Sequence, residues 1–258
     1  MTMLDFSTRK KDNQNISMIT CYDATFARIV NASAIDCILI GDSCAMVMHG
    51  EKTTIPATMD MMTMHTKAVR AGAPDKFIVA DMPFLSTRKG TAHAVECAGA
   101  LLRAGANAVK IEGTFGQEDT LRHLVQSGIP VMAHLGLTPQ FYNSLGGHKM
   151  QGKTEDAAQK IKEEALLSEQ CGCFAVLLEC IPEALAEEIT RSLDVATIGI
   201  GAGNQTDGQV LVLQDMLGMS GFCPRFVKKY LDGETLIAGA LNQYASEVQS
   251  GAFPRPRS

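Results

Sequence analysis

The sequence lacks the features that mark secreted, membrane-bound and nucleic-acid-binding proteins. Residues 1–12 are mostly polar and contain no apolar stretch of the kind a signal peptide needs. No window approaches the roughly 18 consecutive apolar residues that span a bilayer. The 23 Lys and Arg and 28 Asp and Glu residues are spread along the chain, so no basic run is present to follow a phosphate backbone. We therefore expect a cytoplasmic protein with neither a membrane nor a nucleic-acid partner.

The chain also lacks a Pro/Gly/Ser-rich linker, a low-complexity tract and an internal repeat. Its 258 residues are 46% hydrophobic and 20% charged, which allows a large buried core. We expect a single domain over residues 1–258, with a short flexible N-terminus at about 1–12 and a flexible C-terminal tail at about 252–258.

Disulfides are not expected, although the chain contains eight cysteines. The cysteines fall inside apolar runs, and a chain of this length does not need covalent cross-links. Cys171 and Cys173 have no second thiol or histidine pair nearby at zinc-binding spacing, so a structural zinc site is not expected either.

Short apolar runs alternate with longer stretches of helical periodicity, which predicts parallel strands joined by helices. Eight such units in about 250 residues favour a single-domain (β/α)8 TIM barrel; an open doubly wound sheet is the alternative. The predicted strands are 17–20, 37–40, 77–80, 108–111, 131–133, 175–178, 196–198 and 209–213. The predicted helices are 23–32, 59–71, 92–104, 118–126, 156–170 and 183–192, with more helix from Arg225 to the end.

Polar side chains end five of these strands, at the face where barrel enzymes hold their active sites. They are Asp42 with Ser43, Asp81, Lys110 with Glu112, His134 and Glu179. A single Asp after a strand is usually a helix cap or turn former. Four carboxylates in one cavity repel one another unless a cation or substrate compensates, so the group as a whole predicts a binding site.

Oxygen ligands on separate strand ends suit Mg²⁺, with Asp42, Asp81 and Glu112 as the metal ligands. We leave His134 out of the metal set, because a lone histidine more often orients a neighbour. Lys110 shares a strand face with Glu112 and either pairs with a substrate carboxylate or neutralises Glu112. Glu179 closes a strongly apolar run that would raise its proton affinity, which fits a general base; a structural ion pair with Lys110 is the alternative.

Two loops have compositions that suggest a role in binding. Residues 141–153 are polar and glycine-bearing, which suits a mobile lid. Residues 199–203 form a glycine-rich turn after the seventh strand, where many barrels hold phosphate, although such a turn alone is weak evidence.

Seven motifs in order resemble the ketopantoate hydroxymethyltransferase family, over nearly the whole chain. They are Ile40-Gly-Asp-Ser43, Ala80-Asp-Met-Pro-Phe84, Val109-Lys-Ile-Glu-Gly113, His134-Leu-Gly-Leu-Thr-Pro-Gln140, Gly146-Gly-His-Lys-Met-Gln-Gly152, Leu178-Glu-Cys-Ile-Pro182 and Ile198-Gly-Ile-Gly-Ala-Gly-Asn204.

The resemblance implies a Mg²⁺-dependent, class II aldolase-like barrel that assembles into a homo-oligomer, commonly a decamer. Such an enzyme transfers a hydroxymethyl group from 5,10-methylenetetrahydrofolate to 3-methyl-2-oxobutanoate, giving 2-dehydropantoate and tetrahydrofolate. By motif, the metal ligands fall on Asp42, Asp81 and Glu112, and the proton acceptor falls on Glu179. The substrate contacts fall on Asp42, Ser43, Asp81 and Lys110.

The sequence departs from the family pattern at Cys44-Ala45, at residues 85–88 and at Gln214, none of which is an expected metal or base position. The second departure would alter folate-side contacts or an oligomer surface. One alternative is another Mg²⁺-dependent keto-acid lyase or mutase of the phosphoenolpyruvate mutase and isocitrate lyase superfamily, but the Lys-Lys-Cys-Gly-His loop of its lyase branch is absent. A second alternative is an inactive scaffold barrel, against which the retention of every expected metal and base residue argues.

Overall fold

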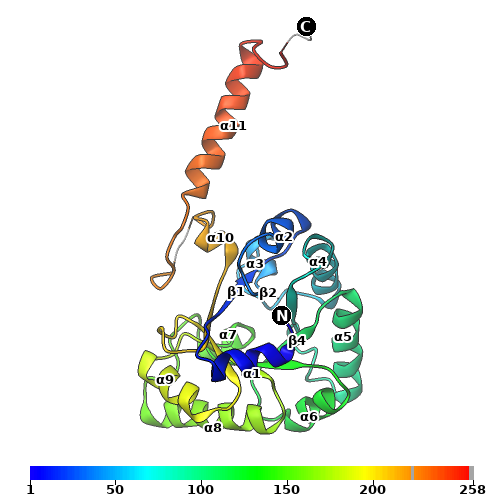
Figure 1. Cartoon of the computed structure of the whole chain (residues 1–258), viewed down its shortest axis with the longest axis vertical. Helices are drawn as coiled ribbons and strands as arrows, with labels where there is room; N and C mark the ends of the chain where they lie inside the picture. The colour runs from blue at the N-terminus through cyan, green and yellow to red at the C-terminus, as the bar shows by residue number, and fades with distance from the viewer. Residues whose placement is uncertain (222–223, 256–258) are drawn as a thin grey trace. The chain divides into compact units, whose positions relative to one another are not determined.

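The computed structural model describes residues 1–221 and 224–255, which fall into two compact units. The first unit spans Met1–Leu211 and the second begins at Val212 (Figure 1). We had expected one domain to extend to the C-terminus, whereas the barrel itself is complete at Leu211.

The first unit is a closed barrel of parallel strands in sequential order, with the last strand paired to the first. This confirms the predicted (β/α)8 fold. The strands are β1 Ile16–Thr20, β2 Cys37–Ile40, β3 Phe77–Asp81, β4 Ala108–Glu112, β5 Val131–Gly136, β6 Ala175–Glu179, β7 Ala196–Ile200 and β8 Gly208–Leu211.

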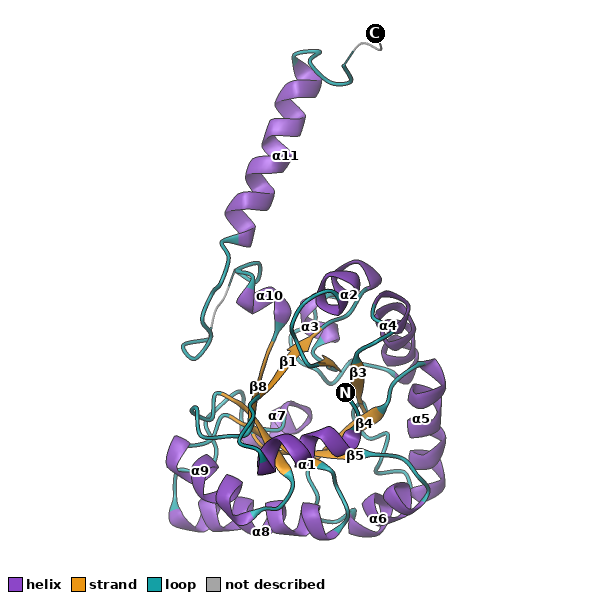
Figure 2. Ribbon diagram, in the orientation of Figure 1, coloured by secondary structure: helices purple, strands orange, loops and turns teal. Residues whose placement is uncertain are grey.

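Helices surround the ring of strands, as Figure 2 shows. The long helices of the first unit are α1 Met3–Lys11, α2 Ala24–Asn31, α4 Met59–Gly72, α5 Thr91–Ala104, α6 Glu118–Gln126, α8 Glu155–Gln170 and α9 Glu183–Ser192. Several begin at side-chain caps that satisfy free backbone N–H groups: Asp23 accepts from Thr25 and Phe26, and Thr58 accepts from Met61. Three shorter helical turns, which the sequence did not lead us to expect, lie in the loops after strands: α3 Cys44–Val47, η1 Pro139–Phe141 and α7 Tyr142–Leu145.

The N-terminus is helical where we expected a flexible segment. Phe6 of α1 is fully buried, and its ring packs against those of Phe77 and Phe174 at the N-terminal end of the barrel. One aromatic side chain among polar neighbours gives little helical signal in the sequence, yet it docks α1 onto the barrel core. Residues 3–11 are therefore helical, and the flexibility expected for residues 1–12 stays a prediction.

The second unit contains α10 Leu213–Met216 and α11 Gly233–Gln249. The predicted C-terminal helix thus begins at Gly233 rather than Arg225, and the last three residues of the expected tail lie outside the described residues. Along α11, the large apolar side chains of Leu236, Ile237, Leu241, Tyr244 and Val248 are exposed.

Two further expectations concern membrane-spanning helices and disulfide bonds. In the described part of the chain, no helix has the length and apolar character needed to cross a membrane. The seven described cysteines are free thiols, and all except Cys180 are buried, in line with the expected absence of disulfides.

Candidate functional site

The predicted polar residues meet at the C-terminal ends of neighbouring strands. Asp81, at the end of β3, stands opposite Lys110 of β4, and Glu112 of β4 stands opposite His134 of β5. All four side chains are buried. The parallel register therefore brings together groups that lie far apart in the sequence.

The remaining predicted residues lie at the ends of β2 and β6. Asp42 is buried two residues after β2, and its backbone N–H donates to Asp81 Oδ2 at 3.0 Å. Ser43 begins the turn of α3, with its hydroxyl 2.9 Å from that of Tyr22. Glu179 ends β6 and keeps 19% of its side chain exposed. This exposure leaves Glu179 accessible from the mouth of the barrel.

Each of the three predicted metal ligands has one carboxylate oxygen that accepts a hydrogen bond. Asp81 Oδ2 accepts from the Asp42 backbone, Asp42 Oδ2 from the Gln140 side chain and Glu112 Oε2 from the Gln140 backbone. The other oxygens of Asp81 and Glu112 are buried and accept no hydrogen bond within the described part of the chain, although the Lys110 ammonium lies 3.2 Å from Asp81 Oδ1. A buried carboxylate oxygen without a donor is costly unless a cation or ligand faces it.

Lys110, His134 and Glu179 form a buried chain of contacts. Lys110 Nζ lies 2.7 Å from His134 Nδ1, and His134 Nε2 lies 3.0 Å from Glu179 Oε2. An ammonium group only donates, so His134 Nδ1 must accept, which assigns the proton of the neutral ring to Nε2. Nε2 lies close to Glu179 Oε2, but no hydrogen bond joins the two atoms among the described residues. Lys110 also lies 3.2 Å from Asp81 Oδ1, so it pairs with Asp81 rather than with Glu112.

Burial of the carboxylates raises their proton affinity. The pKa of Glu179 is raised to about 7 by burial, even though the charges of Lys110 and His148 act in the opposite direction. Burial and then the neighbouring Asp81 charge raise the pKa of Asp42 to about 7. Burial and the Asp42 charge also raise the pKa of Glu112. A carboxylate with a pKa near neutrality is suited to proton transfer.

The pKa values of the two basic groups of the site shift in opposite directions. Burial alone would lower the pKa of Lys110, but the surrounding carboxylates, Asp81 first, raise it above its usual value. Burial and the Lys110 charge hold the pKa of His134 well below its usual value. The site therefore contains a charged lysine beside a neutral histidine.

The backbone around Glu179 adopts conformations that are uncommon for side-chain-bearing residues. Cys180, which follows Glu179, has a left-handed backbone with φ of 47°. Gly136 of β5 has φ of 89°, and a Cβ there would collide with the Glu179 carbonyl oxygen. These positions allow β5 and β6 to lie close together at the site.

The residues present fit a divalent ion that keeps part of its water shell. Within the described residues, no group of three or more His, Cys, Asp or Glu side chains is arranged to hold a metal ion, so Asp42, Asp81 and Glu112 do not form a complete three-ligand set. Mg²⁺ usually binds through one or two carboxylates and retains several waters. The buried oxygens of Asp81 and Glu112 that accept no hydrogen bond are of the kind this ion prefers, and Asp81 Oδ1 is also paired with Lys110. The assignment of Asp42, Asp81 and Glu112 as ligands stays a prediction.

Gln140 is a site residue to which the sequence analysis assigned no role. It lies in η1, and its side-chain Nε2 donates to Asp42 Oδ2 and to the Met82 carbonyl. It was part of the motif that follows β5, and its position directly after Thr138-Pro139 marks a turn next to the strand end. That signal indicates a turn but no contact with Asp42 or Glu112.

Two other predicted features receive no direct test. Residues 146–153 of the expected lid contain no helix or strand, and His148 lies near enough to Glu179 to affect its pKa. In the glycine-rich turn after β7, Gln209 donates to the Gly203 carbonyl. Both the lid and the phosphate-binding turn stay predictions.

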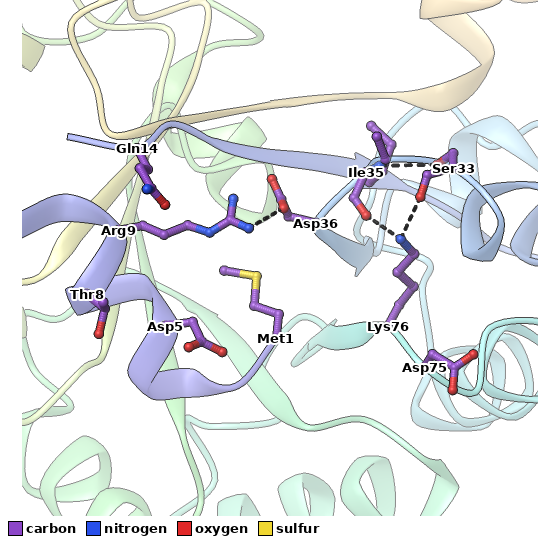
Figure 3. A pocket seen from close by; sticks show the side chains of 11 residues that line it. Met1, Asp5, Thr8, Arg9, Gln14, Ser33, Ile35, Asp36, Asp75 and Lys76 are labelled. Carbon is purple, nitrogen blue, oxygen red and sulfur yellow. Dashed lines mark hydrogen bonds and ion pairs between the residues drawn. The ribbon is translucent and has the colours of Figure 1, made fainter. Parts of the chain in front are cut away.

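A cavity of about 490 Å³ lies beside α1, lined by residues of α1 and of the loops before β2 and β3 (Figure 3). Its cationic side chains already have partners. Arg9 contacts Asp36 at 2.6 Å, and Lys76 donates to the carbonyls of Ser33 and Ile35. This cavity contains none of the predicted site residues.

Comparison with known proteins supports the assignment that the motifs indicated. The family model described as ketopantoate hydroxymethyltransferase matches residues 1–256. The chain belongs to this family. A 3-methyl-2-oxobutanoate hydroxymethyltransferase of Bdellovibrio bacteriovorus is 58% identical over 254 residues, covering 98% of this chain and 97% of the relative.

Solved structures with much lower identity share the fold of this ketopantoate hydroxymethyltransferase family member. A phosphonopyruvate hydrolase in complex with oxalate and Mg²⁺ matches with a TM-score of 0.64 at 11% identity, covering 97% of this chain and 88% of that one. A 2,3-dimethylmalate lyase of the PEP mutase/isocitrate lyase superfamily matches with a TM-score of 0.62 at 14% identity, covering 97% and 98%.

Proposed function

We propose that the protein transfers a hydroxymethyl group from 5,10-methylenetetrahydrofolate to 3-methyl-2-oxobutanoate, forming 2-dehydropantoate and tetrahydrofolate. Membership of the family supports the reaction. The observation that carries the mechanism is the buried contact chain from Asp81 through Lys110 and His134 to Glu179. This chain supports a base at Glu179 and an anion-binding group at Lys110.

The oxygens of Asp42, Asp81 and Glu112 would hold Mg²⁺, and the structural neighbour that binds oxalate with Mg²⁺ supports this choice of ion. When bound, the ion supplies Lewis-acid stabilisation of negative charge on the substrate keto oxygen. Lys110 and Ser43 would bind the substrate carboxylate; the charge of Lys110 and the position of Ser43 next to Asp42, at the start of α3, support this role. Asp42 and Asp81 provide the remaining predicted substrate contacts.

Glu179 takes the proton from the branched carbon of the keto acid. Its raised pKa makes proton transfer from a weak carbon acid more favourable than it would be to an ordinary glutamate. His134 Nε2 lies 3.0 Å from Glu179 Oε2, which fits His134 to a supporting role beside the base. The carbon then attacks the one-carbon unit of the folate; a carbon–carbon bond forms, the carbon–nitrogen bonds to that unit break, and water provides the hydroxyl oxygen.

The alternative of a different keto-acid lyase or mutase rests on the shared barrel of the low-identity neighbours. The family match over residues 1–256 favours the hydroxymethyl transfer. An inactive scaffold is disfavoured because such a protein would have no need to keep the carboxylates of Asp42, Asp81 and Glu112 buried together.

We further propose that the protein is a cytoplasmic homo-oligomer, with a decamer suggested by the resemblance. The exposed apolar side chains of α11, including Leu236, Leu241 and Tyr244, support association with other copies. The free thiols of the seven described cysteines support a reducing compartment.

The test is to incubate the protein with Mg²⁺, 3-methyl-2-oxobutanoate and 5,10-methylenetetrahydrofolate carrying ¹³C in the methylene group. Mass spectrometry should detect 2-dehydropantoate with one ¹³C atom, and Asp81→Asn should abolish its formation. Absence of labelled product, combined with turnover of phosphonopyruvate or 2,3-dimethylmalate, would replace this function with a hydrolase or lyase activity.

A further inference from the structure

Gln140 connects the turn after β5 to the ends of three other strands. Its side-chain Nε2 lies 2.8 Å from Asp42 Oδ2, after β2, and 2.9 Å from the Met82 carbonyl oxygen, after β3. Its backbone N–H donates to Glu112 Oε2 of β4 at 2.9 Å. No other residue named in the site contacts two of the predicted metal ligands through hydrogen bonds that it donates.

The chemistry of these contacts determines the orientation of the amide. A carboxylate and a backbone carbonyl can only accept, so the amide must present its NH₂ group to both, and its two protons are both used. Rotating the amide would place its oxygen against two acceptor oxygens. The Gln140 side chain is therefore held in one orientation with its donors on the carboxylate side.

The contacts also determine which carboxylate oxygens remain available. Gln140 engages Oδ2 of Asp42 and Oε2 of Glu112, whereas Glu112 Oε1 is buried without a hydrogen-bond donor among the residues described. Asp81 has Oδ2 held by the Asp42 N–H, while Oδ1 accepts no hydrogen bond and lies 3.2 Å from the Lys110 ammonium. Held oxygens fix the carboxylate planes, and Glu112 Oε1, 3.6 Å from His134 Nδ1, is the oxygen of this pair that no cation faces.

We propose that Gln140 is a positioning residue of the metal site, which orients Asp42 and Glu112 so that their second oxygens face the ion. This inference rests on the metal site of the proposed function. Residues that orient metal ligands contribute substantially to affinity, and their loss typically costs about 10- to 100-fold in metal binding or activity.

The test uses Mn²⁺, which also prefers octahedral oxygen sites, as a probe whose free form is measured by electron paramagnetic resonance. Gln140→Met has nearly the same length and volume but no donor. It should weaken Mn²⁺ binding about 10- to 100-fold. Gln140→Asn keeps the amide but shortens its reach, so it should also weaken binding, and it provides a second variant if Gln140→Met does not fold.

Gln159→Met is the matched control. Gln159 is an exposed residue of α8 that donates its amide to Glu163 Oε1 at 2.9 Å, so this variant also removes an amide-to-carboxylate hydrogen bond, but outside the site. It should bind Mn²⁺ as the wild type does. The spectrum of bound Mn²⁺ should change in the two Gln140 variants and not in the control, which a purely structural loss of stability would not produce.

The outcomes separate this inference from the proposed function. If the wild type binds Mn²⁺ but folded Gln140→Met and Gln140→Asn bind it equally well, Gln140 is not a positioning residue, and the metal site stands. If the wild type itself binds no Mn²⁺, the metal site fails and this inference fails with it.

Discussion

The two ends of the barrel treat charged groups in opposite ways. At the N-terminal end, Arg9 pairs with Asp36 and Lys10 pairs with Asp207, each ion pair partly open to solvent. At the C-terminal end, several carboxylates are buried together, and two of their oxygens find no hydrogen-bond donor in the part of the chain that the structure describes. Charged side chains at the N-terminal end form ion pairs, whereas carboxylates at the C-terminal end are buried close to one another.

The pKa values express the same contrast. Although burial alone would raise it, hydrogen bonds from Ser17 and Arg9 hold the pKa of Asp36 below its usual value. Burial instead raises the pKa values of Asp42 and Glu179 to about 7. Uncompensated charge at the C-terminal end costs stability, and this cost is what a bound cation and substrate would relieve. The N-terminal end stabilises the fold and the C-terminal end is arranged for chemistry.

Glu179→Gln should produce the largest effect at the C-terminal end. Loss of a general base typically reduces the rate by about 10²- to 10⁴-fold, because the amide cannot take the proton from the branched carbon. We expect this loss in the exchange of that hydrogen with solvent deuterium, followed by nuclear magnetic resonance. Mn²⁺ binding should stay at the wild-type level, and exchange at the normal rate would require another base.

Phe6→Ala should produce the largest effect at the N-terminal end. Removing a fully buried phenylalanine side chain from an aromatic cluster costs about 3–5 kcal/mol in the free energy of unfolding. Urea denaturation measures this loss. Exchange per folded molecule should be unchanged, and a change in the exchange rate of the folded variant would show that the two ends are not independent.

The stability of the metal-free protein should fall as the pH rises from about 4 to about 7. Ordinary aspartate and glutamate pKa values are near 4 in the unfolded chain, whereas those of Asp42 and Glu179 are about 7 in the folded protein. The folded state therefore binds more protons in this window, which makes the free energy of unfolding decrease with pH.

Thermal unfolding between pH 5 and pH 8, with and without Mg²⁺, measures this effect. Mg²⁺ should raise the melting temperature most at pH 8, where the carboxylates are charged. Asp42→Asn should reduce the pH dependence of the metal-free protein. A melting temperature that rises steadily to pH 8 without metal would contradict the buried-carboxylate account.

Arg9→Ala should have the smallest effect. The Arg9–Asp36 pair is partly exposed, with 29% and 16% of the two side chains accessible. Such pairs contribute about 0–1 kcal/mol to stability. Urea denaturation should detect at most this change, and Mn²⁺ binding should be unaffected. A loss of Mn²⁺ affinity in this variant would show that the ion pair at the N-terminal end affects the metal site at the C-terminal end.

The repeating strand and helix pattern was enough to predict the barrel, because most strands are short apolar runs buried on both faces. The same regularity located the strand ends and so the polar residues that follow them. The short helices α3, η1 and α7 were not predicted, since each spans only three or four residues and has no periodicity to detect. Docking of α1 depends on Phe6 meeting Phe77 and Phe174, a tertiary contact that local pattern does not encode.

The site was predictable where a strand positions the side chain. Lys110 and Glu112 share a strand face, and both are buried at the site. Gln140 was missed because a turn, rather than a strand, positions it, and its partners come from three other strand ends. The proton position on His134 likewise follows only from its contact with Lys110.

The most direct test of the central claim is solvent exchange in 3-methyl-2-oxobutanoate without any folate. With Mg²⁺ present, the wild-type protein should replace the hydrogen on the branched carbon with deuterium, while Glu179→Gln with Mg²⁺ should leave it in place. Folded wild-type protein that binds the metal and the keto acid but catalyses no exchange would contradict the account of the C-terminal end as a site of proton abstraction.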